Sequence, residues 1–376
     1  MSDCWDLIVV GCGGIGSCAL LSGARRGWRV LGLEQFGAAH DLGSSHGQTR
    51  IIRRAYFEHP NYVPMAQQAF ESWRQIEQET CSTLLETPGL LQTGTLESEV
   101  IQGVQSSADQ FGLEIERLSR DEIQKRWPVF SIPDDHIGLF EAGAGYLRVE
   151  KCVAQVLGLA VKAGAEFRAS CNVNGWTSSD GESLVTTNGE TLRTKRLVIS
   201  PGAWAPGLLD RLGVKFQILR KQQHWFQLDR HELQQANGMC CFLMDTAKGC
   251  FYGFPQYDSM GIKVAEHTGG QECHADSVDR EINFEDLERT EKFLTEHFLF
   301  TRSRLVRQSV CMYTMSPDSH FIVDRFPGES SVAFAAGLSG HGFKFAPVLG
   351  EHLVNLADCN ESNAFDFLKL GRFSGQ

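Results

Sequence analysis

The chain has 376 residues, of which 42% are hydrophobic and 22% are charged. These values lie near the averages for compact proteins, so they exclude a disordered or fibrous chain, and the length predicts two or three domains. The 46 Asp and Glu residues outnumber the 35 Lys and Arg residues, and the resulting formal charge of -11 argues against a nucleic acid as a partner.

The sequence does not have the pattern expected of a membrane span or of a secretory signal. No apolar run reaches the roughly 18 to 20 residues that span a bilayer. The segment Met1–Cys4 has no basic residue of the kind that opens a secretory signal peptide. We therefore expect a cytoplasmic protein without a membrane partner.

The 12 cysteines are scattered from Cys4 to Cys359 and never form a Cys-x-x-Cys pair. This spacing argues against zinc knuckles and thioredoxin-like chemistry, and no metal site is expected. Because a cytoplasmic protein keeps its thiols reduced, each cysteine is first interpreted as a small apolar core residue.

The N-terminal segment has the pattern of a strand, a helix and a second strand. The apolar run 6–10 meets the glycine turn Gly11-Cys12-Gly13-Gly14-Ile15-Gly16. A helix is predicted over 15–27 and a strand over 28–33, which ends at Glu34. A Gly-x-Gly-x-x-Gly turn in this setting predicts a dinucleotide-binding unit.

Each part of the turn has a physical task in such a unit. Gly11 permits the tight turn, Gly13 lets the backbone approach a pyrophosphate at the helix N-terminus, and Gly16 lets the helix pack closely on the strand. Glu34 lies at a suitable distance along the chain to accept hydrogen bonds from an adenosine ribose. The motif alone does not separate NAD from FAD.

The polar segment 43–54 follows and contains His46, Arg50, Arg53 and Arg54 between flexible residues. A loop of this composition is expected where a chain wraps an anionic ligand. The regular alternation of strands and helices expected of a nicotinamide dehydrogenase does not continue here, which favours FAD.

The rest of the chain mixes helical and strand patterns. Helices are predicted over 62–79, 151–163 and 284–298, a hairpin over 184–192, and a strand-rich region over about 216–316. The apolar strand 196–200 ends at Pro201-Gly202-Ala203-Trp204, where an open sheet meets its ligand.

A second glycine turn lies near the C-terminus. The apolar strand 332–336 leads into Gly337-Leu338-Ser339-Gly340-His341-Gly342-Phe343-Lys344 and a helix that ends near Leu356. Two such turns more than 300 residues apart suggest that both ends of the chain meet at one long ligand.

Four blocks stand in a distinctive order and spacing. They are 11–16, 43–53, Cys311-Met312-Tyr313-Thr314 with Pro317-Asp318 and Phe321-Ile322-Val323-Asp324, and 339–344. In these blocks the chain resembles the monomeric sarcosine oxidase and N-methyltryptophan oxidase family of FAD-dependent amine oxidases, almost from end to end. Ser45 and Gln48 are closer to the peroxisomal sarcosine and pipecolate oxidases, although the C-terminus Phe373-Ser374-Gly375-Gln376 is not a peroxisomal address.

The resemblance implies an α/β fold with a Rossmann-like FAD-binding domain and a discontinuous α+β substrate domain whose sheet is largely antiparallel. The FAD domain would comprise 1–83, 150–215 and 317–376. The substrate domain would comprise 84–149 and 216–316. The protein is expected to be a monomer.

The resemblance also implies roles for single residues. Cys311 would hold the flavin through a thioether, while Arg53 and Lys344 would bind the substrate carboxylate. Lys263 would activate oxygen. His267 would share its strand face because the two are four residues apart.

Further residues would line the same site. The expected catalytic group also includes Arg50, Tyr252 and Tyr313. The expected FAD contacts are Gly11, Gly13, Gly14, Ile15, Gly16, Glu34, Gln35, Ser44, His46, Thr49, Arg50, Gly202, Trp204, Cys311, Gly337, Gly340, His341, Gly342, Phe343 and Lys344.

The implied reaction is oxidation of a secondary amino acid by oxygen, which gives hydrogen peroxide and an imine that hydrolyses. Sarcosine would give glycine and formaldehyde. A cyclic imino acid oxidase acting on pipecolate or proline is an alternative, as are a flavin dehydrogenase and a non-catalytic FAD-binding protein. Lys263 argues against the last two, because an oxygen-activating lysine has no evident task in them.

Overall fold

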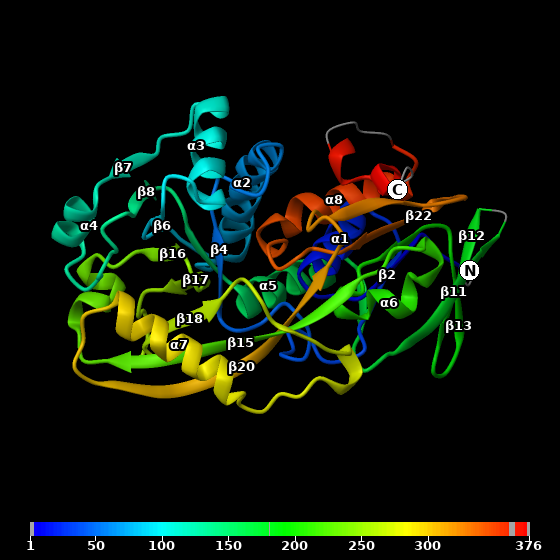
Figure 1. Cartoon of the computed structure of the whole chain (residues 1–376). Helices are drawn as coiled ribbons and strands as arrows, with labels where there is room; N and C mark the ends of the chain where they lie inside the picture. The colour runs from blue at the N-terminus through cyan, green and yellow to red at the C-terminus, as the bar shows by residue number, and fades with distance from the viewer. Residues whose placement is uncertain (1–3, 180, 361–364, 374–376) are drawn as a thin grey trace.

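A computed structural model of the chain describes residues 4–179, 181–360 and 365–373 (Figure 1). The signal-peptide and peroxisomal arguments also used residues 1–3 and 374–376, which lie outside the described residues. The helices are α1 (Gly14–Arg25), α2 (Tyr62–Thr80), α3 (Glu99–Phe111), α4 (Arg120–Arg126), α5 (Val149–Lys162), α6 (Ala205–Leu208), α7 (Phe284–His297) and α8 (Ala346–Ala357).

A six-stranded sheet organises the half of the molecule that contains the N-terminus. Its order is β10 (Glu166–Arg168), β3 (Val30–Leu33), β2 (Leu7–Val10), β14 (Leu197–Ile199), β22 (Glu329–Ala336) and β21 (Ile322–Phe326). Every pair is parallel except β21 with β22. All four residues of β2 are buried, as expected for a parallel strand covered on both faces.

The two faces of this sheet pack against different layers. Leu7 and Val9 face a core shared with helices α1, α2, α5 and α8. Ile8 and Val10 face a core shared with a four-stranded sheet. That sheet has the order β1 (Cys4–Trp5), β13 (Thr191–Thr194), β12 (Glu182–Thr187) and β11 (Val173–Ser179). The predicted α/β class is therefore confirmed, and β12 with β13 is the predicted hairpin.

A nine-stranded sheet fills the other half of the molecule (Figure 1). Its path is β19 (Gln271–Glu272), β15 (Gln217–Leu228), β18 (Ile262–Glu266), β17 (Gly249–Phe254), β16 (Cys241–Thr246), β6 (Leu90–Gly94), β8 (Ile137–Glu141) and β7 (Glu116–Leu118), with β20 (Ser303–Met315) paired to β15. One pair, β6 with β16, is parallel and the others are antiparallel. This agrees with the largely antiparallel sheet expected, whereas the domain bounds stay a prediction.

The segment 43–54 differs from the loop predicted for it. Residues Thr49–Ile52 form strand β4, which pairs with β9 (Gly145–Arg148), and β9 also pairs with β5 (Leu85–Glu86). A partner strand almost a hundred residues away satisfies the backbone of β4, so the local polar composition could not reveal this strand.

The remaining differences concern element ends. Helix α1 begins at Gly14 and β3 at Val30, and β18 ends at Glu266, one residue before His267. The His267 amide still donates to the Cys250 carbonyl at 2.7 Å, which extends the ladder past the strand end. Within the described residues, no helix has the length and apolar character that a membrane crossing requires.

Candidate active site

Two cavities adjoin each other beside the glycine turn, and the larger of these two has a volume of about 460 Å³ and lies at the carboxyl ends of the parallel strands β2, β3, β14 and β22. This is the edge at which open α/β sheets bind ligands. The predicted FAD contacts that line it are Gly11, Gly13, Gly14, Ile15, Glu34, Gln35, Ser44, Arg50, Gly202, Trp204, Cys311, Gly337, Gly340, Gly342 and Phe343.

Glycine is required at the turn between β2 and α1. Gly11 has a φ of 80°, and a Cβ there would lie 2.5 Å from the Ser200 carbonyl oxygen. A Cβ on Gly16 would lie 1.7 Å from the Gly11 oxygen. Gly16 is therefore a packing residue outside the cavity lining, whereas Gly13 at the N-cap has no side chain to cap α1, and the Gly14 N–H donates to the Ser45 hydroxyl at 3.0 Å.

Glu34 occupies the end of β3 as the nucleotide motif predicts. It is buried and accepts the Cys12 N–H at 3.0 Å and the Phe36 N–H at 3.1 Å. Burial favours the protonated form, but hydrogen bonding to His40 and to these amides holds the pKa of Glu34 below its usual value. The side chain is thus a fixed anion that can accept further donors from a ribose.

The larger cavity suits FAD in both shape and chemistry. Its volume is within the usual range for ligand pockets of about 300 to 1,000 Å³, and the glycine turn, the helix N-terminus and Glu34 follow one another along its wall. The buried Thr314 hydroxyl also belongs to the lining and has no hydrogen-bond partner among the described residues. These residues fit the cofactor that the sequence predicted.

Cys311 and Arg50 lie together in the wall of the larger cavity. The Arg50 Nη2 is 3.2 Å from the Cys311 sulfur and donates to the Ser44 carbonyl at 2.9 Å. Strand β20 positions Cys311 because it pairs with β15 over its whole length, with Cys311 opposite Lys221. Cys311 therefore lies in the wall of the larger cavity beside a fixed positive charge.

A second, smaller cavity of about 60 Å³ adjoins the first, because Arg50, Tyr313, Gly340 and Phe343 line both. Its other lining residues are Ile51, Arg53, Phe57, Glu58, Leu243, Tyr252, His267, His341 and Lys344. The structure thus brings together Arg53, Lys344, His267, Tyr252 and Tyr313, which the sequence assigned to the catalytic or carboxylate-binding group.

Arg53 already has a carboxylate partner in this cavity. Its Nη2 contacts both Glu58 oxygens, at 2.8 and 2.6 Å, and its Nη1 donates to the Ala55 carbonyl at 2.9 Å. Burial opposes ionisation of Glu58, but the adjacent Arg53 charge lowers the pKa of this carboxyl to about 2. Glu58 is therefore an anion, and a substrate carboxylate has to compete with it for Arg53.

Lys344 lies on the same wall. Its Nζ donates to the His341 carbonyl at 2.7 Å and to the Tyr56 hydroxyl at 3.1 Å. Burial and the Arg53 charge lower the pKa of Lys344 to about 7. The charge of this ammonium therefore changes in the neutral range.

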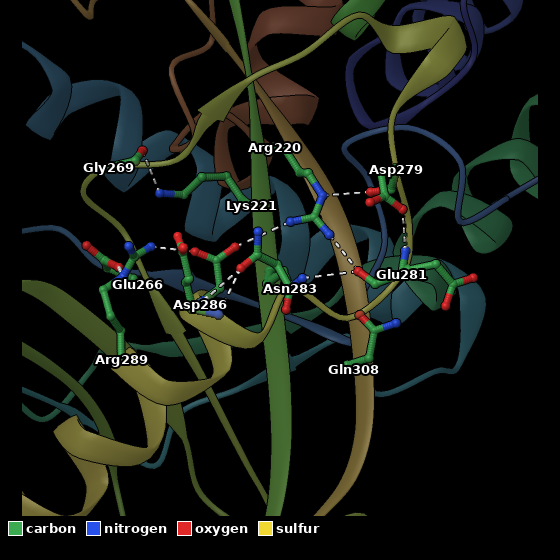
Figure 2. A network of polar contacts seen from close by, with 12 residues as sticks. Arg220, Lys221, Glu266, Gly269, Asp279, Glu281, Asn283, Asp286, Arg289 and Gln308 are labelled. Carbon is green, nitrogen blue, oxygen red and sulfur yellow. Dashed lines mark hydrogen bonds and ion pairs between the residues drawn. The ribbon is translucent and has the colours of Figure 1, made fainter.

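His267 faces Tyr313, with its Nδ1 3.4 Å from the Tyr313 hydroxyl. Burial lowers the pKa of His267 to about 4, so the imidazole is neutral at pH 7. The turn after His267 is held by Lys221, whose Nζ donates to the carbonyls of His267, Thr268 and Gly269 at 2.9, 2.6 and 3.0 Å. Figure 2 shows Lys221 reaching Gly269, and beside it Arg220 reaching Asp279 and Glu281.

Lys263 belongs to the lining of neither cavity. It is buried, and its Nζ donates to the Gly47 carbonyl at 2.6 Å and to the Thr49 carbonyl at 3.0 Å. Arg50 Nη1 donates to the same Thr49 carbonyl at 2.9 Å. Lys263 is thus one carbonyl away from the guanidinium that lines both cavities.

Four other predicted FAD contacts lie outside the lining of the larger cavity. His341 and Lys344 line the smaller cavity. His46 and Thr49, in the segment 43–54, are buried and line neither cavity, and His46 Nδ1 lies 3.4 Å from the Ser309 hydroxyl. The sequence missed the lining residues Cys171–Asn174 and also Glu58, because no motif or periodicity marks them and their contacts come from distant segments.

Comparison with known proteins adds three relationships. A family model described as FAD dependent oxidoreductase matches residues 6–356. Monomeric sarcosine oxidase from Streptomyces avermitilis is 38% identical over 363 residues, which are 95% of this chain and 94% of that protein. N-methyl-L-tryptophan oxidase from Yersinia pestis is 36% identical over 350 residues, which are 92% of this chain and 93% of that protein.

The fold has matches among solved structures as well. NikD, an amino acid oxidase of nikkomycin biosynthesis, superposes with a TM-score of 0.86 at 21% identity, covering 98% of each chain. At that identity the match supports the fold alone. The sequence relatives decide the family: this chain is an FAD-dependent oxidoreductase and belongs with monomeric sarcosine oxidase and N-methyl-L-tryptophan oxidase.

Proposed function

We propose that the protein is an oxidase of small N-methyl amino acids such as sarcosine, with oxygen as the electron acceptor. The observation that carries this proposal is the smaller cavity, which places three cationic side chains, Arg50, Arg53 and Lys344, and a neutral histidine next to the larger cavity. Bound FAD would accept a hydride from the carbon next to the amine nitrogen and deliver the electrons to oxygen, giving hydrogen peroxide.

The cavity volume supports a small substrate. A buried water molecule needs a cavity volume of roughly 10 to 15 Å³. A cavity of about 60 Å³ therefore has room for about four to six water-sized groups. This suits a molecule the size of sarcosine and leaves no room for an indole side chain. Pipecolate and proline have more non-hydrogen atoms than this room holds, so sarcosine fits better than either.

Charge would orient the substrate within the cavity. Arg53 and Lys344 would bind the carboxylate, Arg53 by exchanging its Glu58 partner for the substrate. The amine must be neutral so that its lone pair can support the developing iminium. The fixed charges of Arg50 and Arg53 lower the pKa of a bound amine, and neutral His267 can accept a hydrogen bond from it.

The FAD cofactor would be held by residues at both ends of the larger cavity wall, from the glycine turn to Cys311. Gly11, Gly13 and Glu34 would hold the nucleotide, and Cys311 would hold the flavin covalently. The buried Lys263 cation would stabilise the superoxide formed in the first electron transfer to oxygen. Cytoplasmic location and a monomeric state are proposed along with this function.

A substrate panel with a peroxide readout tests the function. Sarcosine should give a kcat/KM at least about tenfold above that of N-methyltryptophan, pipecolate and proline, a difference of about 1.4 kcal/mol in transition-state stabilisation. A preference for N-methyltryptophan would contradict the size argument. Turnover of sarcosine with an artificial acceptor but without peroxide would contradict the oxidase assignment.

A further inference from the structure

Lys263 owes its position to one short turn, residues 47–49. The Lys263 ammonium donates to the carbonyls of Gly47 and Thr49 at the two ends of this turn. The turn and Lys263 are more than 200 residues apart in the chain. The position of the ammonium therefore depends on whatever fixes the turn.

Glu150 contacts the same turn at its backbone amides. Glu150 is at the start of α5, and its carboxylate accepts the Gly47 N–H at 2.6 Å and the Gln48 N–H at 3.1 Å. The Gln48 N–H and the Gly47 carbonyl belong to one peptide group. That group thus connects the Lys263 ammonium to the Glu150 carboxylate, with a charge-assisted hydrogen bond at each end.

Neighbouring contacts fix the orientation of this peptide. Gly47 has a φ of 90°, and a Cβ there would lie 1.9 Å from the Gln223 side-chain oxygen. Gln48 has a φ of 66°, and its side-chain oxygen accepts the Trp225 indole N–H at 2.7 Å. The hydrogen bonds of Gln48 to Trp225 and to Glu150 therefore hold the peptide in this orientation.

We propose that Glu150 is a positioning residue for oxygen activation, which holds Lys263 beside Arg50 by way of the Gly47–Gln48 peptide. This role rests on the proposed function of Lys263. It assigns a task to a carboxylate that has no part in binding substrate or FAD, since Glu150 lies outside the lining of both cavities.

The electrostatics agree with the geometry. Burial and the Arg50 charge lower the pKa of Lys263, whereas Glu150 raises it. The titratable and charged groups that act on Lys263 are Arg50, His46, Arg307, Cys311 and Glu150. Without the Glu150 charge, Lys263 should lose its proton at a lower pH.

Amide hydrogen exchange of the segment containing Gly47 and Gln48 tests the contact without using activity. Glu150→Gln and Lys263→Met should each speed exchange in this segment by about tenfold or more, because each removes a charged partner from the turn. Glu190→Gln, a carboxylate change in an exposed ion pair, is the matched control and should leave it unchanged. Unchanged exchange in Glu150→Gln would overturn the proposal.

The pH dependence of flavin reoxidation tests the consequence. In Glu150→Gln the reaction with oxygen should slow at high pH, with its midpoint shifted to lower pH and little change at low pH. Flavin reduction by substrate should remain at the wild-type rate. An unshifted midpoint, or equal slowing of both half-reactions at every pH, would overturn the proposal.

A combined variant separates this proposal from the proposed function. In a Lys263→Met background, Glu150→Gln should have no further effect on reoxidation. If Lys263→Met alone leaves reoxidation fast, the role of Lys263 fails, whereas slow Lys263→Met with unshifted Glu150→Gln contradicts the role of Glu150 alone. If Glu150→Gln does not retain flavin, Glu150→Asp should give a smaller shift in the same direction, and no shift there would overturn the proposal.

Discussion

At the scale of single residues, the buried ion pair of Arg53 and Glu58 involves the guanidinium that the proposed function assigns to the substrate carboxylate. Because Glu58 occupies the guanidinium that would bind a substrate carboxylate, Glu58→Gln should tighten binding of a small carboxylate inhibitor by about tenfold. Flavin absorbance during inhibitor titration measures the affinity. Weaker binding in Glu58→Gln would show that the pair orients Arg53 rather than competing for it.

Lys344 gives the same cavity a pH dependence. Because its pKa is about 7, it is a cation below pH 7 and neutral above. The affinity for a carboxylate inhibitor that carries no amine should therefore fall as the pH rises through 7. Lys344→Met should weaken binding about 10- to 100-fold at pH 6 and remove this pH dependence.

The comparison variant for this titration is Arg53→Ala. It should also weaken inhibitor binding, but it should retain a pH dependence, shifted to higher pH because the Arg53 charge that lowers the pKa of Lys344 is gone. A pH dependence that persists in Lys344→Met would assign the titration to another group.

Cys311 makes a prediction about the cofactor itself. Flavin should remain with the polypeptide after acid precipitation, and Cys311→Ala should release it, because the thioether requires the sulfur that lies beside Arg50. Absorbance of the pellet and the supernatant measures the partition. Wild-type protein that is loaded with flavin and releases all of it on precipitation would contradict covalent attachment.

At the scale of elements, helices α1 and α8 pack so closely that Gly350 of α8 has no room for a side chain. A Cβ on Gly350 would lie 2.6 Å from both the Ala19 nitrogen and the Cys18 Cβ. Gly350→Ala should therefore lower the free energy of unfolding by about 1 to 3 kcal/mol, as overpacking usually does. Urea unfolding measures this change.

Gly158 in α5 is the matched control, because a Cβ there meets no described atom within 4 Å. Gly158→Ala should raise the free energy of unfolding by about 0.4 to 1 kcal/mol, since alanine restricts the unfolded chain and favours the helix. Equal effects of the two substitutions would contradict the packing argument.

The sequence predicted an element correctly where the pattern that identifies the element lies within the same segment. The β2 to β3 unit, helix α2 and the hairpin of β12 and β13 follow from apolar periodicity and glycine placement within a few residues. Strand β4 was missed because its hydrogen bonds go to β9, almost a hundred residues away. Pairing between distant segments leaves no local pattern.

The same reason explains what was missed in the site. Arg53 and Lys344 lie in recognisable blocks, and the structure brings them to one cavity. Glu58, Glu150 and Lys221 act through contacts that the spacing of residue types does not encode. Glu150 contacts a turn about a hundred residues earlier in the chain, and the Lys221 partners are backbone carbonyls.

At the scale of the whole molecule, the two long strands β15 and β20 join the halves of the site (Figure 1). Strand β20 places Cys311 and Tyr313 in the wall of the larger cavity, and β15 pairs with β18, which contains Lys263. The proposed oxygen side thus lies on this sheet, whereas Arg53 and Lys344 of the proposed substrate side come from segments outside it. Substitutions on the two sides should separate the two half-reactions.

Stopped-flow kinetics of Lys263→Met tests this separation most directly. Mixing dithionite-reduced enzyme with oxygen should show reoxidation slower than in the wild type by about 100- to 1000-fold, equivalent to about 3 to 4 kcal/mol of charge stabilisation. Anaerobic reduction by sarcosine should change far less. Reoxidation at the wild-type rate would show that Lys263 is an ordinary buried lysine. It would contradict the proposal that Lys263 activates oxygen, on which the oxidase assignment depends.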